Sequence, residues 1–263
     1  MNNTLIMIFV ILLGFAMGSF SACMGYRIPN KISTYKKRSF CPKCKKELKW
    51  YMNIPFVSFV LLGGKCAYCK KPISIMYPII EITSALLYFL AYELYINTNP
   101  VSIYSFLIAI ILSTAFLITA VSDFMYYYVS DRVVLISLIT IVLLKYFFIG
   151  ADEVISSLIS GAAIFAVMMF VKFCGDRVFK KESLGGGDIK LMGVIGVTLG
   201  FVPALIALFI SSVFGLIFSL FAKSDDKTHI IPFGPFLLFS ALLCFYFVEP
   251  IKYFIEEILR ITL

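Results

Sequence analysis

Three consecutive glycines precede an aspartate in the run Gly185, Gly186, Gly187 and Asp188, and this aspartate opens an apolar segment. An acid at the centre of a bilayer costs roughly 2.5–3.5 kcal/mol on insertion scales, so a carboxylate at the membrane edge is expected to have a role. Glycine has no Cβ, and its backbone can therefore lie close to a bound chain. The run fits two interpretations equally: a functional acid beside a substrate-binding turn, or a flexible turn whose acid caps the next helix.

Two further aspartates, Asp123 and Asp131, stand between the third and fourth apolar segments. With Asp188 they could supply an aspartic dyad, in which one carboxylate activates a water and its protonated partner polarises the scissile carbonyl. Two such groups about 3 Å apart share one proton, because both cannot be charged. From the residues alone, Asp123 fits a catalytic acid and an acid at a helix end equally well, whereas Asp131 is better explained as the N-cap of the fourth segment.

The residue types present exclude several mechanisms of peptide hydrolysis. The chain has a single histidine, His229, which excludes a His-Glu-x-x-His zinc protease, and it has no Gly-x-Ser-x-Gly turn. Carboxylates therefore remain as the candidate groups. Glu81, about one turn inside the second apolar segment, either lines the site or reaches the lipid headgroups. Lys190 lies two residues after Asp188 and is a candidate to bias the dyad electrostatically.

Two Cys-x-x-Cys pairs, Cys41 with Cys44 and Cys66 with Cys69, lie in a lysine-rich loop. Such pairs suit a tetrahedral thiolate zinc site, which a small loop needs because it cannot bury much apolar surface. Four thiolates leave no open coordination position, so this zinc is expected to be structural and not catalytic. We predict structural zinc; redox-active cysteines and a metal-free loop are the alternatives.

The composition is that of a membrane protein: 61% of the 263 residues are hydrophobic and 14% are charged. Ordinary soluble domains are about 25% charged. The apolar runs predict an all-α polytopic fold with about eight transmembrane helices. Fusing residues 191–222 into one helix gives seven, but such a helix would be about 48 Å long against a core of about 30 Å, and Gly200 and Pro203 favour a break. The predicted segments are about 4–24, 76–96, 101–121, 133–149, 154–173, a short 189–199, 201–222 and 232–248.

Basic residues are concentrated on one predicted side of the membrane. Residues 25–75 hold 12 Lys and Arg against the single acid Glu47. With the N-terminus outside, the inward loops hold 20 of the 23 basic residues. By the positive-inside rule, the cysteine loop and the aspartates described above then face the cytoplasm. This rule explains the basic block better than a nucleic-acid partner does, so no nucleic acid is expected.

A series of short motifs runs in a fixed order along nearly the whole chain. The motifs are Gly18-Ser19-Phe20, Tyr26-Arg27-Ile28-Pro29, the two cysteine pairs, Tyr77-Pro78-Ile79-Ile80-Glu81, Ser122-Asp123, Gly185-Gly186-Gly187-Asp188-Ile189-Lys190-Leu191 and Pro232-Phe233-Gly234-Pro235. In this order the motifs resemble those of the type IV prepilin peptidase family, membrane aspartic peptidases that share a Gly-x-Gly-Asp signature.

The resemblance implies cleavage of prepilin or pseudopilin precursors after a basic leader, at a glycine just before an apolar helix, on the cytoplasmic side of the inner membrane. Matched residue by residue, Asp188 is the motif acid and Asp123 the first catalytic acid, while Asp131 receives no catalytic role. The expected substrate-binding residues are Gly185, Gly186, Gly187, Lys190 and Glu81.

Members of this family often also methylate the new N-terminus with S-adenosylmethionine, an activity linked to the N-terminal half. In that half the chain departs from the family pattern at three places. Ser21-Ala22-Cys23-Met24 stands where Leu-Asn-Val-Val is usual, Met52 replaces an acid, and Gly63 replaces an arginine. The sequence therefore leaves methylation, and S-adenosylmethionine as a cofactor, open.

Together these patterns predict two domains: residues 1–96, with the zinc module at about 25–75 between the first two spans, and a peptidase domain of residues 97–263. The expected partners are the lipid bilayer, the precursor substrates, and pilus or secretion assembly proteins. Two hypotheses from other classes remain, an ion-coupled transporter that uses Asp123, Glu81 and Asp188 as ligands, and a non-enzymatic membrane scaffold for a pilus or secretion assembly.

Overall fold

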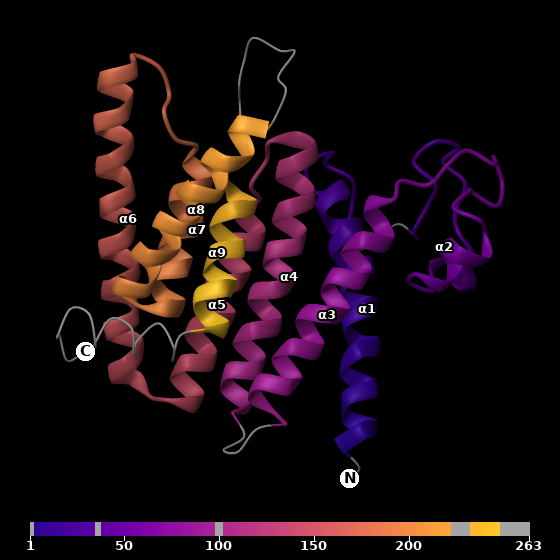
Figure 1. The fold of residues 1–263 in the computed structure, drawn as a ribbon, viewed down its shortest axis with the longest axis horizontal. Helices are drawn as coiled ribbons and strands as arrows, with labels where there is room; N and C mark the ends of the chain where they lie inside the picture. Colours follow the sequence, from indigo (N-terminus) through magenta and orange to yellow (C-terminus); the bar gives the residue numbers. More distant parts are fainter. Residues whose placement is uncertain (1–2, 35–37, 98–101, 222–231, 248–263) are drawn as a thin grey trace. The chain divides into compact units, whose positions relative to one another are not determined.

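The computed structural model describes residues 3–34, 38–97, 102–221 and 232–247. In these ranges, eight helices of 13 or more residues correspond one to one to the predicted apolar segments, which confirms the all-α prediction (Figure 1). His229 lies outside the described residues. The eight helices are α1 (Asn3–Arg27), α3 (Met76–Tyr95), α4 (Ile103–Tyr126), α5 (Asp131–Phe148), α6 (Ala151–Phe179), α7 (Gly186–Leu199), α8 (Phe201–Phe221) and α9 (Gly234–Tyr246).

The helices make this a multi-pass membrane protein. Within the described ranges, α1, α4, α6 and α8 are each long and apolar enough to cross a bilayer. The predicted break between α7 and α8 is present at Gly200, whose φ of +88° is readily adopted only by glycine. The alternative of one fused helix over residues 191–222 is therefore wrong. The number of membrane crossings stays a prediction.

The chain folds as two compact units, Met1–Tyr126 and Tyr127–Leu263. The first contains α1, α3, α4 and the loop module with its short helices η1 (Trp50–Asn53) and α2 (Val57–Leu61). The second contains α5 to α9. The sequence-based division after residue 96 stays a prediction.

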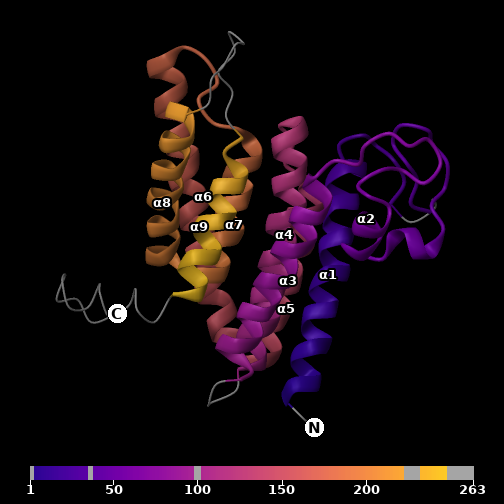
Figure 2. The ribbon, with the colours of Figure 1, turned by 45° about the vertical axis from the view of Figure 1, so that its right-hand side comes forward.

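In the first unit, glycines let α1 lie directly against α3, and the two helices run antiparallel (Figure 2). A Cβ added at Gly14 would lie 2.7 Å from the Cα of Ala85, and one added at Gly18 would lie 2.6 Å from the Cα of Glu81. Because the two glycines are four residues apart, they share one face of α1, the small-residue spacing by which membrane helices approach closely. This packing fixes the position of Glu81 against α1.

Helix α4 completes the first unit. Tyr88 of α3 shares a hydrogen bond with Thr114 of α4, with their hydroxyl oxygens 2.9 Å apart. Near the other end of α1, Gly25 lies against the side chain of Val121 of α4. The last turns of α1 and α4 therefore lie at the same end of the unit, and the loop module that follows α1 begins at that end.

Helix α7 lies at the centre of the second unit, in contact with α5, α6, α8 and α9. Eight of its 14 residues are buried. Its contact with α6 is close, because a Cβ added at Gly196 would lie 3.0 Å from the Cα of Gly161. A helix this short is about 21 Å long and falls short of a bilayer core of about 30 Å, so its burial among longer helices is what makes it stable there.

Candidate active site and metal centre

Asp123 lies in the last turn of α4, and only 5% of its surface is exposed. It follows Val121, which packs against α1, and Ser122, whose hydroxyl donates a hydrogen bond to the Thr119 carbonyl. A buried carboxylate at a helix end is costly unless it interacts with another group or has a function. Asp123 is thus an interior acid, not one that points freely into solvent.

Asp188 is the third residue of α7 and is partly exposed. An acid in the first turn of a helix is favoured by the helix dipole. The carboxylate folds back toward the start of its own helix, because a Cβ added at Gly185 would lie 3.1 Å from its Oδ2 atom. The two interpretations of this acid are therefore compatible: it lies at the helix start and it remains accessible.

Gly187 is required for packing. A Cβ at this position would lie 2.6 Å from the Cβ of Val129, a stiff β-branched side chain in the segment before α5. A Cβ at Gly186 would meet nothing within 4 Å. The start of α7 thus lies directly on the segment before α5, and this contact holds the backbone next to Asp188. Contact of these glycines with a substrate stays a prediction.

The difference between the two glycines gives a direct test. We expect Gly187→Ala to lower the thermal unfolding temperature, at a free-energy cost of about 1–3 kcal/mol for overpacking. The matched variant Gly186→Ala should be neutral or slightly stabilising, because alanine has the higher helix propensity. Unfolding of both purified variants in the same detergent checks this, and equal unfolding temperatures would contradict the packing role.

Lys190 forms an ion pair with Asp131 of α5, with Nζ and Oδ1 2.7 Å apart. Its expected electrostatic effect on the dyad stays a prediction. Both side chains are largely exposed, at 50% and 70%. Exposed pairs contribute about 0–1 kcal/mol, so this one orients the helix starts more than it stabilises the fold. The N-cap of α5 is Ser130, and Asp131 is the first helical residue, so the N-cap prediction for Asp131 was wrong by one position.

Glu81 of α3 is 6% exposed, and its Oε2 accepts a hydrogen bond from the backbone N–H of Phe56 at 2.7 Å. Phe56 belongs to the loop module, just before α2. Glu81 therefore points toward the module and does not reach outward to the headgroups. The bond explains how a carboxylate tolerates burial here, and it ties the module to the helices of the first unit.

The four predicted cysteines of the module converge. Their Sγ atoms all lie within 4.8 Å of one another, and the sulfurs of Cys41 and Cys69 are 4.0 Å apart. A tetrahedral zinc with Zn–S bonds of about 2.3 Å places its sulfurs about 3.8 Å apart, so the arrangement fits this ion. Backbone N–H groups of Cys69 and Tyr68 donate to Cys66 and lower its pKa to about 7, which favours the thiolate that a metal binds.

The two cysteine pairs have the same backbone structure. In the first, Cys41 N–H donates to the carbonyl of Lys46, and Lys45 N–H donates to the carbonyl of Cys41. The same two bonds recur around Cys66, with Lys71 and Lys70 as partners. Lys45 and Lys70 both have positive φ, 60° and 56°, a conformation for which the sequence, with lysine and not glycine there, gave no signal.

Comparisons with known proteins agree over most of the chain. Residues 12–95 match the bacterial peptidase A24 N-terminal domain, and residues 110–220 match the type IV leader peptidase family. A prepilin leader peptidase/N-methyltransferase of Vibrio cholerae is 33% identical over 251 residues, 89% of this chain and 93% of the relative. This chain belongs to the type IV leader peptidase family.

Further members of the family are similar over comparable lengths. Prepilin leader peptidase/N-methyltransferases of Bacillus subtilis and Legionella pneumophila are 29% and 31% identical, over 90% and 84% of this chain and 93% and 76% of the relatives. No solved structure matches the chain significantly. As a leader peptidase family member the chain is an enzyme, and neither the transporter nor the scaffold hypothesis is favoured.

The two family matches divide the site residues of this leader peptidase between them. The N-terminal match covers the cysteine cluster and Glu81, and the type IV leader peptidase match covers Asp123 and Asp188. The two aspartates and the cysteine cluster therefore lie in parts of the chain that match different families.

Proposed function

We propose that this leader peptidase removes the basic leader of prepilin or pseudopilin precursors at the cytoplasmic face of the inner membrane, cutting after the glycine that precedes the apolar helix. The observation that carries the proposal is the similarity, over nearly full length, to enzymes named for prepilin leader cleavage. The excess of basic residues in the inward loops supports the orientation.

We further propose that Asp123 and Asp188 form the catalytic dyad. Both acids lie within residues 110–220, which match the type IV leader peptidase family. Asp123 is a buried acid in the last turn of α4, and Asp188 is a partly exposed acid in the first turn of α7. In the proposed mechanism, the ionised carboxylate takes a proton from water, the water oxygen attacks the scissile carbonyl, and the protonated carboxyl gives its proton to the carbonyl oxygen. When the tetrahedral intermediate collapses, the C–N bond breaks, the leaving amine takes the proton held by the first carboxyl, and a hydroxyl proton returns to the second.

Zinc is proposed to hold the module together through Cys41, Cys44, Cys66 and Cys69, with no part in the cleavage step. In support of this role, the four sulfurs would fill all four ligand positions of a tetrahedral ion and leave none open for water or substrate.

A second activity is proposed on the basis of the relatives' names, which include N-methyltransferase. S-adenosylmethionine supplies an electrophilic methyl group on a sulfonium. The lone pair of the neutral amine at the new N-terminus attacks this methyl carbon, the carbon–sulfur bond breaks with its electrons returning to sulfur, and the nitrogen releases one proton. Pilus or secretion assembly proteins are the proposed partners that receive the processed product.

One assay tests both activities. Full-length protein is incubated with a precursor peptide that spans the leader and the start of the apolar helix, with and without S-adenosylmethionine, and the products are weighed. We expect a product that begins after the glycine in both reactions, and a gain of one methyl group only with the donor. An uncut peptide would refute the peptidase proposal, and a cut but unmethylated peptide would refute the second activity alone.

A further inference from the structure

One part of the loop module, residues 50–64, carries no charge although the chain on both sides of it is basic. Of the eight Lys and Arg in residues 38–75, five precede this uncharged segment and three follow it, and the single acid, Glu47, also precedes it. The uncharged segment contains the two short helices η1 and α2. An apolar stretch between basic residues is typical of segments that lie in a membrane interface.

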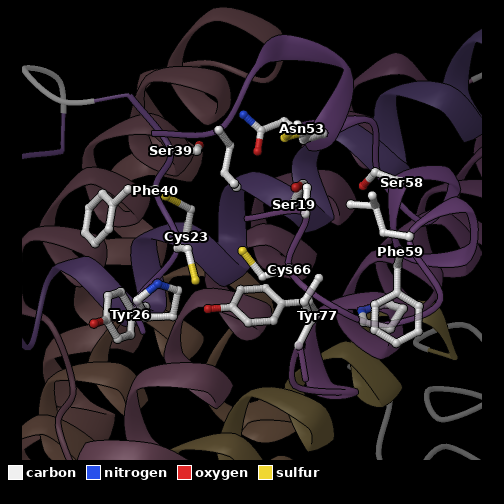
Figure 3. Close-up of a pocket in the computed structure, with 18 of the residues that line it drawn as sticks. Ser19, Cys23, Tyr26, Ser39, Phe40, Asn53, Ser58, Phe59, Cys66 and Tyr77 are labelled. Carbon is white, nitrogen blue, oxygen red and sulfur yellow. The ribbon is translucent and has the colours of Figure 1, made fainter. Parts of the chain in front are cut away.

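Helix α2 has an inner and an outer face. The inner face lines a cavity between the module, α1 and the start of α3, and it consists of Ser58, Phe59 and Leu62 (Figure 3). On the outer face Val57 and Val60 are exposed, and Leu61 is 80% exposed, as is Trp50 of η1. Large apolar side chains gathered on one exposed face mark a contact with a protein or with a membrane.

The position of α2 along α1 decides between these two partners. Helix α2 lies beside α1, below the end of α1 from which the module departs (Figure 1). The ring centroid of Phe56, the residue before α2, is 6.3 Å from that of Phe15. Phe15 is at the middle of α1, 12 residues or about 18 Å before Arg27. Since α1 is long and apolar enough to cross a bilayer, its middle is a depth that a soluble partner protein does not reach.

The backbone of this segment meets the requirement that a bilayer imposes, namely that N–H groups find partners within the protein. Pro55 has no N–H, and the N–H of Phe56 donates to the Glu81 carboxylate of α3. The N–H groups that follow donate to carbonyls of the same segment, among them those of Ser58, Val60, Leu62, Gly63 and Gly64. The bond to Glu81 thus satisfies the N–H at the point where α2 begins.

We propose that the uncharged segment enters the cytoplasmic leaflet, with the outer face of α2 against phospholipid acyl chains and Trp50 at the headgroups. Tryptophan is favoured at this interface, and Lys49 and Lys65, which flank the segment, then lie at the level of anionic headgroups. The sequence alone predicted a cytoplasmic loop over residues 25–75. In the proposal the loop is cytoplasmic at its two cysteine pairs and membrane-embedded between them.

The chain has a single tryptophan, Trp50, so its intrinsic fluorescence reports on this segment in the unmodified protein. Full-length protein is placed in phospholipid nanodiscs and quenched either by lipids with brominated acyl chains or by iodide in the water. A second probe is Leu61→Trp combined with Trp50→Phe. We expect both tryptophans to lose most of their emission to the brominated lipids and little to iodide.

Tyr68→Trp combined with Trp50→Phe is the matched control. Tyr68 is an exposed aromatic residue of the same module, but it lies between Cys66 and Cys69, outside the uncharged segment. We expect the opposite result for a tryptophan at this position, namely quenching by iodide and little by the brominated lipids. Iodide quenching without lipid quenching at position 50 or 61 would overturn the proposal and leave this face open to a soluble protein.

Lipid cross-linking tests the same contact without any substitution. A phospholipid with a photoactivatable group in the middle of its acyl chain is irradiated in nanodiscs that hold the wild-type protein. Trypsin cuts after Lys49 and Lys65, which releases the segment as one peptide of residues 50–65. We expect label on this peptide and none on peptides from residues 38–49 or 66–75; an unlabelled 50–65 peptide would contradict insertion. Neither measurement involves a precursor, so the peptidase proposal is tested separately.

Discussion

Replacing Asp188 by asparagine should lower the rate constant for leader cleavage by about 10²–10⁴-fold, the contribution typical of a positioned acid or base. Asparagine has nearly the same shape but cannot take a proton from water or lend one to the carbonyl. Asp123→Asn should have an effect of similar size, because either change leaves a single carboxyl that cannot hold both roles. Single-turnover cleavage of a precursor peptide by each purified variant measures the loss.

The double variant makes this prediction specific to a dyad. When two residues act as a unit, removing the second costs little once the first is gone. We therefore expect Asp123→Asn with Asp188→Asn to be about as slow as either single variant. Multiplication of the two losses would show that the acids act independently, and near-normal cleavage by either single variant would refute the assignment. Asp152→Asn, which changes an exposed acid in the first turn of α6, is the matched control.

Features set by residues close together in the sequence were predictable. Contacts between residues far apart in the sequence were not. Apolar length located the helices, and Gly200 located the break between α7 and α8, because both signals act within a few residues. The cysteine spacing located the cluster of four sulfurs that could hold a metal for the same reason. The bond between Glu81 and Phe56 joins residues 25 apart, and the Lys190–Asp131 pair joins residues 59 apart. No periodicity or spacing encodes such partners.

The glycines show the same division. The run at 185–187 was interpreted as room for a substrate, but the structure separates its members: Gly187 is closed in by Val129, and Gly186 is open. Gly14 and Gly18 carried no prediction about α3, although their spacing is the small-residue pattern by which helices approach in a membrane. That pattern was the available signal for the α1–α3 contact.

Loss of the metal is the second change for which we expect a large effect, here on the folding of the loop module. In zinc-binding peptides the ion contributes about 10–16 kcal/mol of folding free energy, so a small loop module that loses it is expected to unfold. We expect Cys66→Ser, or treatment with a strong chelator, to abolish stoichiometric zinc in metal analysis and to expose the backbone of residues 38–75 to hydrogen exchange. Cys174→Ser replaces an exposed cysteine outside the cluster and should change neither result.

The helices and the module should respond differently to this loss. The α1–α3 contact rests on Gly14 and Gly18 and does not involve the cysteines, so the helical content measured by circular dichroism should remain. The Glu81–Phe56 bond depends on the module, so it should be lost together with zinc. Protection of the module that persists in zinc-free protein would contradict the structural role.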